Sequence, residues 1–282
     1  MQAAFARIHS ALQNLQNDRG IQWLHASLEK LKSSKDVVNE LLIQSAGTRR
    51  ILGEERLGGE VLIVAEDLQL PIQRWTASDA GRALLILQAI AIAPEIEQEI
   101  VQTYFEQGDE SEIASLVRVI NLLNGAKRYK FHMREVSRTN SKPLYAALAQ
   151  YNPYPARFYD DHEFNQLVLK ALFMGIGIDS VIGLNERANP ELSKMCEDYI
   201  DERLAAARSL PHDIWLALEP FASEKGLALI KQYSKHETPE HRYFAVKALQ
   251  QQRPLDAERK QWLKELLECE KDDRILVLLS SN

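Results

Sequence analysis

The chain has 282 residues, 45% apolar and 26% charged, a balance typical of a globular protein with one large domain or two smaller ones. A formal net charge of −6 argues against general nucleic-acid binding, which needs a basic surface to neutralise phosphates. The two cysteines, Cys196 and Cys269, lack the spacing of a zinc site or a disulfide framework, so we expect neither.

No segment of the sequence has the pattern of a signal peptide or of a membrane span. Residues 1–17 lack an apolar core, and the longest apolar run, 83–93, is shorter than the roughly 20 residues that a bilayer requires. We therefore expect a cytoplasmic protein with no direct insertion into a membrane.

Apolar residues at helical spacing predict helices across most of the first 140 residues. The exception is 47–71, where the pattern breaks. There the run Val61–Val64, flanked by glycines, fits either a short strand or one turn of a buried helix.

Capping signals place the helix boundaries that follow. Ser78 is expected to cap a helix that covers the run 83–93 and ends at Pro94. Ser111, with Glu112 beside it, is expected to open another helix. Acidic residues in a first turn are favoured by the helix dipole.

Two neighbouring segments carry opposite charge. Residues 95–112 hold seven acids and no lysine or arginine, whereas 127–142 hold six bases and one acid, with Tyr129 and Phe131 between the bases. This pattern fits an anion-binding face. It equally fits two oppositely charged helices that lie side by side.

Residues 151–173, YNPYPARFYDDHEFNQLVLKALF, carry the densest set of polar and aromatic groups in the chain. Asp160 and Glu163 have the spacing of a capping box at the start of a helix. The helix over 167–174 is apolar on every face except at Lys170, so we expect it to be central and buried. This stretch therefore has the character of a pocket wall.

The amides of Asn165 and Gln166 need partners if that helix is buried, because an unpaired buried polar group costs roughly 1–3 kcal/mol. They are expected either to bond the backbone of the loop 152–155 or to hold a ligand. His162 has no second histidine at helical spacing, so no metal site is expected here.

The segment 190–208 contains Asp198 and Glu202, four positions apart. On a helix this spacing suits a general acid and base, and it also suits a solvated face. The apolar residues Leu192, Met195 and Tyr199 already supply a core side, which favours the solvated face.

The last quarter predicts four short helices near 222–234, 239–252, 256–268 and 271–280. Their aliphatic patches recur about every 17 residues, and HRYFAVKAL resembles the second helix of a HEAT-type repeat. The predicted fold is all-α, as a right-handed helical solenoid of HEAT-like pairs or as a large multi-helix bundle. We expect a single domain, 1–282, with a possible division into 1–140, 141–220 and 221–282.

The stretch quoted above, continued by GLNERANPELSKMCEDYIDERLAAARSLPHDIW, resembles the EboA family over about residues 151–215. These are bacterial proteins encoded beside a prenyltransferase-like membrane protein, a sugar-phosphate-cyclase-like enzyme and TIM-barrel proteins. The resemblance implies an accessory protein for making or exporting a specialised metabolite, and it supplies no catalytic residues. Ala207 stands where the family pattern has glycine. The matching positions are Asn152, Tyr154, Pro155, Asn165, Gln166, Lys170, Arg187, Asn189, Pro190, Glu202, Arg203 and Arg208.

We therefore expect a non-catalytic accessory, scaffold or binding protein, without a cofactor, for a small specialised-metabolite pathway. Its partners would be proteins of the same pathway or a small-molecule ligand. The alternative is an enzyme or carrier for a polar, phosphorylated or prenylated small molecule that uses Lys170, His162 and Glu202. The candidate binding residues are Asn152, Tyr154, Arg157, His162, Asn165, Gln166, Lys170, Glu202 and Arg203.

Overall fold

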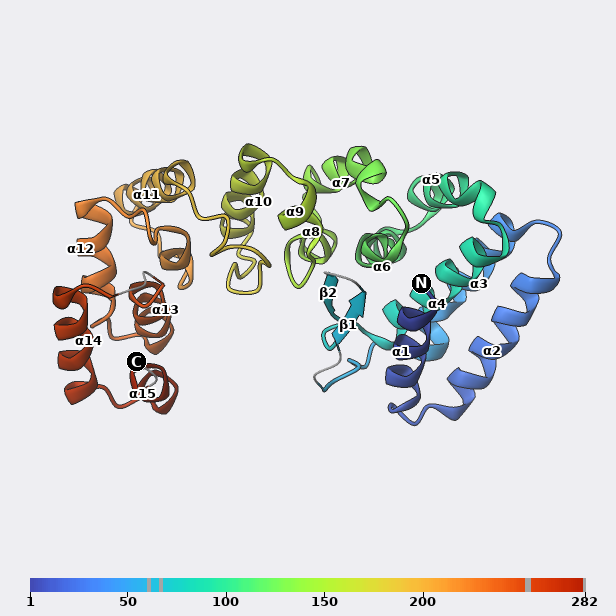
Figure 1. The fold of residues 1–282 in the computed structure, drawn as a ribbon, viewed down its shortest axis with the longest axis horizontal. Helices are drawn as coiled ribbons and strands as arrows, with labels where there is room; N and C mark the ends of the chain where they lie inside the picture. The colour runs from blue at the N-terminus through green and yellow to red at the C-terminus, as the bar shows by residue number, and fades with distance from the viewer. Residues whose placement is uncertain (60–61, 66–67, 252–254, 281–282) are drawn as a thin grey trace. The chain divides into compact units, whose positions relative to one another are not determined.

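The computed structural model describes residues 1–59, 62–65, 68–251 and 255–280 (Figure 1). Almost all of the regular structure in these ranges is helical, which confirms the predicted all-α class. The chain divides into two compact units, Met1–Phe158 and Tyr159–Asn282. The right-handed solenoid, the single-domain organisation and the divisions near 140 and 220 stay predictions.

The first unit is a helical assembly interrupted once by a short hairpin. Its elements are α1 (Gln2–Gln13), α2 (Asp18–Ser33), α3 (Val37–Leu52), β1 (Leu62–Ala65), β2 (Leu68–Pro71), α4 (Ala77–Ile92), η1 (Pro94–Ile96), α5 (Glu97–Gln107), α6 (Glu110–Val119), η2 (Ile120–Leu122), η3 (Ala126–Tyr129), α7 (Lys130–Ser137), α8 (Lys142–Ala149) and α9 (Tyr154–Phe158).

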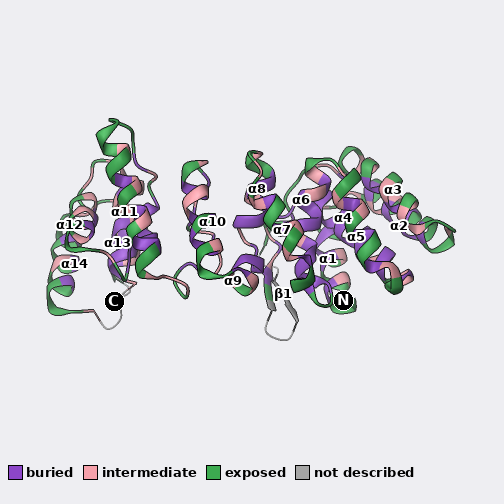
Figure 2. Ribbon diagram, turned by 90° about the horizontal axis from the view of Figure 1, so that it is seen from above, coloured by how far each residue is buried: buried purple, intermediate pink, exposed green. Residues whose placement is uncertain are grey.

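Helix α4 forms the core of this unit. Its residues from Ala77 to Leu87 are all buried, as the burial colouring of Figure 2 shows, and it packs against α1, α2, α3 and α6. A helix that is apolar on nearly every face is stable only in such a position, because each face removes apolar area from water. The long apolar run of the sequence is therefore the central helix of the unit.

The ambiguous segment forms a hairpin. Strands β1 and β2 pair antiparallel with Leu62 opposite Pro71, and β1 contacts α1. Val61, part of the run predicted as strand or buried helix, lies outside the described residues. The described part of the run, from Leu62 to Val64, is therefore a strand.

The second unit contains the remaining helices. They are α10 (Asp161–Phe173), α11 (Pro190–Ala205), η4 (Ile214–Ala217), α12 (Glu224–Tyr233), α13 (Pro239–Leu249), α14 (Ala257–Cys269) and α15 (Asp273–Ser280). The four helices predicted for the last quarter are thus present with nearly the predicted bounds. Position 252, the predicted end of one of them, lies outside the described residues.

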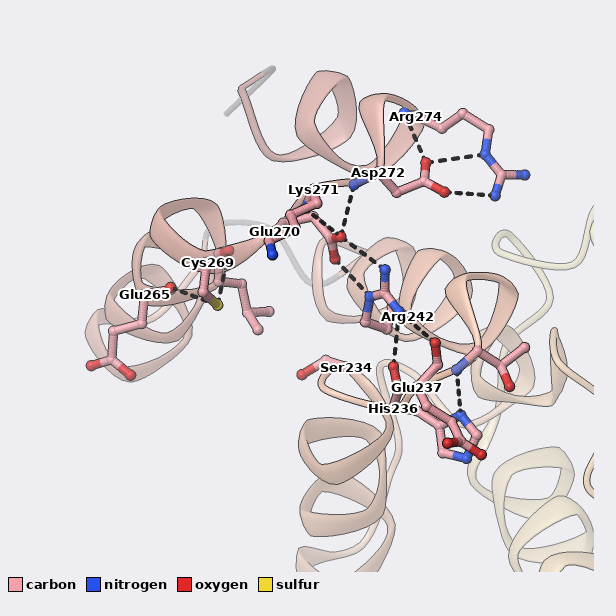
Figure 3. A network of polar contacts seen from close by, with 12 residues as sticks. Ser234, His236, Glu237, Arg242, Glu265, Cys269, Glu270, Lys271, Asp272 and Arg274 are labelled. Carbon is pink, nitrogen blue, oxygen red and sulfur yellow. Dashed lines mark hydrogen bonds and ion pairs between the residues drawn. The ribbon is translucent and has the colours of Figure 1, made fainter.

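A polar network joins α13 to the segment between α14 and α15 (Figure 3). The guanidinium of Arg242 donates from Nε and Nη2 to the two carboxylate oxygens of Glu270, at 2.8 and 2.9 Å. Its Nη1 donates to the backbone carbonyls of His236 and Glu237, each at 2.9 Å. One side chain thus fixes two turns of the second unit.

Two predicted helix starts are wrong, and the reason is the same. Thr76, not Ser78, caps α4, in a capping box with Asp79. Asp109, not Ser111, caps α6, in a capping box with Glu112. In both places the residue that has an acid three positions later becomes the cap, because only that spacing satisfies two backbone donors.

Helix α10 begins where the capping box predicted, but it is buried on only some of its faces. Asp160 and Glu163 form the predicted capping box. Phe164, Leu167 and Val168 are buried, but Phe173 is 74% exposed, so the helix is not buried on every face.

Candidate functional site

Asn152 is a structural anchor of the first unit. Its side chain is buried, and its Nδ2 donates to the carbonyls of Val117 and Ala147 at 3.3 and 2.9 Å. Its Oδ1 accepts from Asn121 Nδ2 at 2.8 Å and from the backbone N–H of Tyr154 at 2.9 Å. Four hydrogen bonds use the full capacity of an asparagine amide. The side chain therefore holds the loop before α9.

The other two candidates of the first unit differ in exposure. Tyr154 is fully buried, and its hydroxyl donates to the carbonyl of Ala126 at 3.2 Å. Arg157 is exposed, with its guanidinium 4.9 Å from the ring centre of Phe158. Of the two, Arg157 is the side chain that presents polar atoms to solvent.

The candidates on α10 belong to the second unit. His162 and Gln166 are exposed, and Lys170 is half-buried, with its pKa lowered by burial. Asn165 is fully buried and exchanges amide hydrogen bonds with Asn189, at 3.1 and 2.9 Å. The partner of the Asn165 amide is therefore a side chain on the way into α11.

The candidates on α11 lie toward its C-terminal end. Glu202 is exposed, and Arg203 donates from Nε to the carbonyl of Ser209 at 2.6 Å and from Nη1 to the hydroxyl of Tyr199 at 3.0 Å. Asp198, the proposed partner of Glu202, forms an exposed ion pair with Lys194 at 2.9 Å. This arrangement is that of a solvated helix face, and whether these residues form a ligand site stays a prediction.

The oppositely charged segments contact each other. Tyr129 donates from its hydroxyl to Glu97 Oε1 at 2.7 Å, and Arg128 lies 3.9 Å from the same carboxylate. His132 bonds Gln102 at 2.7 Å and stacks on Phe105 with ring centres 4.7 Å apart. The geometry favours oppositely charged helices that lie side by side over an anion-binding face.

Sequence reasoning missed a cleft in the first unit. It encloses about 550 Å³, within the range of small-molecule sites, and is formed by the end of α3, the N-terminal turns of α4 and α8, and residues of α6 from its N-cap to its last turn. Ten of the twelve lining residues are polar or charged. The lining consists of Arg49, Glu54, Thr76, Ser78, Asp79, Arg82, Asp109, Glu110, Ser111, Ala114, Arg118 and Pro143.

Most charges in this cleft have partners within the protein. Arg118 donates to Asp79 at 2.9 Å, and the carboxylate of Asp79 also accepts from Ser115 at 2.9 Å. Arg49 forms an exposed pair with Glu54 at 2.9 Å. Two ion pairs within the protein therefore line the cleft, and their charges are already neutralised before any ligand binds.

Arg82 is the exception. This α4 residue is only 2% exposed, yet its Nε has no hydrogen-bond partner within the described parts of the chain. Among those residues it also forms no ion pair, although buried charges are normally paired. A second cavity of about 510 Å³ shares four lining residues with the first, Arg82 among them. The guanidinium therefore borders both cavities.

Asp109 lies near Arg82, and its carboxylate caps the N-terminus of α6. Its Oδ1 accepts from the backbone N–H of Glu112 and from the hydroxyl of Ser111, at 2.8 and 2.7 Å. Burial by itself raises the pKa of Asp109, but these hydrogen bonds and the charge of Arg82 outweigh it and lower the pKa. Nearby, Glu112 Oε1 is also buried without a hydrogen-bond partner among the described residues.

One signal in the sequence points to Arg82. It stands immediately before the apolar run 83–93, so an arginine is carried on a helix that has no polar face to expose it. The capping sequence Thr76-x-x-Asp79 places the same residue in the first turns of that helix, near a helix end. Neither signal reveals that α3 and α6 place other charged side chains in the same cleft as Arg82.

The described residues contain no group of three or more histidine, cysteine or acidic side chains that is arranged to hold a metal ion. None of the described helices combines the length and the apolar character required to cross a bilayer.

A family model described as metabolite traffic protein EboA matches residues 4–219, and the chain belongs to this family. The match extends well beyond the stretch 151–215 that first suggested it and covers the whole of the first unit apart from its first residues. It ends before α12. No curated protein and no solved structure matches the chain.

Proposed function

We propose that the chain is a non-catalytic accessory protein of metabolite traffic that binds a small polar metabolite in the cleft of the first unit. The observation that carries this proposal is the cleft itself, with a volume of about 550 Å³ and a lining of charged and hydroxyl side chains. Small-molecule sites have this size, and their polar groups fix the orientation of the ligand. The family description supplies the context of metabolite handling.

The chemistry of the lining favours binding over catalysis. Asp79 and Arg118 neutralise each other, and the carboxylate of Asp109 serves as a helix cap. A catalytic acid or base needs a proton that it can exchange with the substrate, and these groups hold their hydrogen bonds within the protein. The lining therefore offers a shaped polar surface without a reactive group.

Native mass spectrometry of the full-length protein, purified from its native host, tests this proposal. We expect a bound molecule in the mass range that the cleft accommodates, released on denaturation. The Ser111→Trp variant, which places a large ring in the cleft, is expected to purify without it. Ser33→Trp is the matched control, because Ser33 is exposed on α2 and does not line the cleft. An unliganded wild type, or equal occupancy in both variants, contradicts the proposal.

The alternative, an enzyme or carrier that uses Lys170, His162 and Glu202, has one supporting observation, the lowered pKa of Lys170. A lysine of lowered pKa is a better nucleophile or base at neutral pH. The triple change to alanine tests it: loss of metabolite production or export in the host, with the cleft ligand retained, would favour the alternative. Full retention of function excludes these residues as a catalytic set.

A further inference from the structure

We infer that Arg82 binds an oxyanion, a carboxylate or phosphate group, of a hydroxylated metabolite in the cleft of the first unit. This inference rests on the proposed function, since it names the chemical class of the ligand of that same cleft. The argument begins with the state of the guanidinium. It is 2% exposed, and its Nε has no hydrogen-bond partner within the described chain.

A buried guanidinium without an ion pair or hydrogen bond is unfavourable, because desolvation of the charge is not offset by a direct partner. Asp109 lies close enough for its pKa to respond to Arg82, but in the described part of the chain it forms no ion pair with it. The other two arginines of the cleft show the usual solution: Arg118 pairs with Asp79 and Arg49 pairs with Glu54, each at 2.9 Å. Arg82 lacks such a partner among the described residues while it lines two cavities. A ligand anion would supply the missing partner.

The surroundings keep Arg82 available to a ligand. Asp109, whose pKa its charge helps to lower, forms no ion pair or hydrogen bond with Arg82 among the described residues, and its Oδ1 accepts two hydrogen bonds from α6. Helix α4, which carries Arg82, is buried along most of its length, so the backbone from which the guanidinium extends is fixed. The N-terminal ends of α4 and α6 both border the cleft, and their dipoles add positive potential, although their own caps occupy several N–H groups.

The lining also indicates what the rest of the ligand contains. A guanidinium matches the geometry of a carboxylate or a phosphate with two parallel hydrogen bonds. The same cleft is lined by Thr76, Ser78, Ser111 and Glu110, whose oxygens can accept hydrogen bonds from ligand hydroxyls. Sugar acids and sugar phosphates share this combination of one oxyanion and several hydroxyls.

The first test measures the melting temperature of the full-length protein in sodium phosphate and in sodium chloride at equal ionic strength. Calorimetric titrations with gluconate, glucose 6-phosphate and neutral sorbitol follow. We expect phosphate to raise the melting temperature and at least one of the two anionic probes to bind, while sorbitol does not. A stronger response to gluconate than to glucose 6-phosphate identifies a carboxylate ligand, and the reverse identifies a phosphate.

Arg82→Gln is expected to weaken binding of the anionic probe at least about tenfold, because a charged hydrogen-bonded pair is lost. It should not lower the melting temperature in chloride, since it removes an unpaired buried charge. Arg19→Gln, at an exposed position on α2, changes the net charge equally and should keep wild-type affinity. Arg82→Lys retains the charge without the two-pronged geometry, and an intermediate affinity is expected.

Equal anion responses in wild type and Arg82→Gln, or no response of the wild type to any of the three anions, overturn the inference. Its failure is distinguishable from failure of the proposed function. If the co-purified molecule is lost in Ser111→Trp but retained in Arg82→Gln, the cleft binds a ligand and the oxyanion assignment is wrong. If no molecule co-purifies with the wild type, the proposed function itself fails.

Discussion

Asn165 and Asn189 exchange hydrogen bonds between their side-chain amides, with Nδ2 to Oδ1 distances of 3.1 and 2.9 Å. Asn165 is fully buried on α10, and Asn189 also caps α11 by accepting from the backbone N–H of Leu192 at 2.9 Å. One amide pair therefore holds the start of α11 against α10. This is a structural role, but the partner is the side chain of Asn189 and not the backbone of the loop 152–155 that the sequence analysis expected.

We expect Asn165→Ala to lower the free energy of unfolding of the second unit by about 1–3 kcal/mol, because it removes both hydrogen bonds between the two amides, while Asn189 keeps its bonds to Arg187 and Leu192. Hydrogen exchange of the amides in α10 and α11 measures this loss locally. Gln166→Ala is the matched control, since Gln166 is the exposed neighbour on the same helix and its loss should be nearly neutral. Unchanged protection in Asn165→Ala would contradict the structural role.

Gly81 allows α3 to approach α4 closely. A Cβ atom at this position would lie 2.2 Å from Cδ1 of Leu52 and 2.9 Å from Cγ2 of Thr48, both shorter than van der Waals contact. We expect Gly81→Ala to destabilise the first unit by about 1–3 kcal/mol, although alanine is the better helix former. Urea unfolding monitored by circular dichroism provides the measurement.

A second helical glycine supplies the control for that prediction. At Gly47 the nearest atom to an added Cβ is in Trp23, at 3.4 Å, so Gly47→Ala should leave stability equal or raise it by up to about 1 kcal/mol. Gly81→Ala should cost less in a Leu52→Ala background than in the wild type, because the clashing methyl group is absent there, although Leu52→Ala itself removes buried apolar contacts. Equal behaviour of the two glycines would show that close approach does not limit position 81.

The spacing of apolar residues and the capping signals predicted most of the helices, whereas the other features depend on contacts between segments that are distant in sequence. The bounds of α12 to α15 and the capping box of Asp160 followed from spacing and from residue type, because both are properties of a single segment. The hairpin of β1 and β2 was ambiguous, because a run of four apolar residues fits a strand or a helix. The tertiary neighbours decide between the two.

The cleft was beyond sequence reasoning for a related physical reason. Arg82, Asp109 and Arg49 come from three helices, and no local pattern states that these helices converge. The sequence instead drew attention to 151–173, where polar residues are close in number. Several of them, including Asn152 and Asn165, are buried and have hydrogen-bond partners within the fold. Density of polar groups along the chain does not by itself distinguish a ligand site from a hydrogen-bonded part of the fold.

Glu270 makes the stability of the second unit depend on pH. The hydrogen-bonded guanidinium of Arg242 is the largest cause that lowers the pKa of this carboxyl, from 4.5 to about 2. A carboxyl with a lowered folded-state pKa stabilises the fold above its ordinary pKa, and this contribution fades as pH falls from about 5 toward 2.

We expect Glu270→Gln to destabilise the second unit at pH 7 and to converge with the wild type as pH is lowered toward 3. Hydrogen exchange in α13 at a series of pH values, corrected for intrinsic rates, measures the difference. Glu268→Gln, at an exposed position on α14, is the control and should show no such convergence. A constant difference between Glu270→Gln and wild type across this pH range would contradict the assignment.

A buried ion pair joins the end of the family-matched region to the helices beyond it. Glu219, the last matched residue, accepts from Arg259 on α14 at 2.9 Å, and their side chains are 0% and 8% exposed. Breaking a buried ion pair typically costs about 3–5 kcal/mol, and without Glu219 the guanidinium of Arg259 keeps only its longer contact with Asp256, at 3.4 Å. We expect Glu219→Leu alone to destabilise the second unit by about this amount and to increase hydrogen exchange in α14.

The double variant Glu219→Leu with Arg259→Met separates the pair's net contribution from the cost of breaking it. Apolar residues of similar volume often replace a buried ion pair without loss, so we expect the double variant to regain most of the stability. Chemical unfolding of both single variants and the double variant gives the coupling free energy. If the double variant is as unstable as the sum of the two single ones, the residues act independently and the pair does not hold α14 in place. Recovery of stability would instead show that the ion pair adds little net stability over an apolar contact at this position.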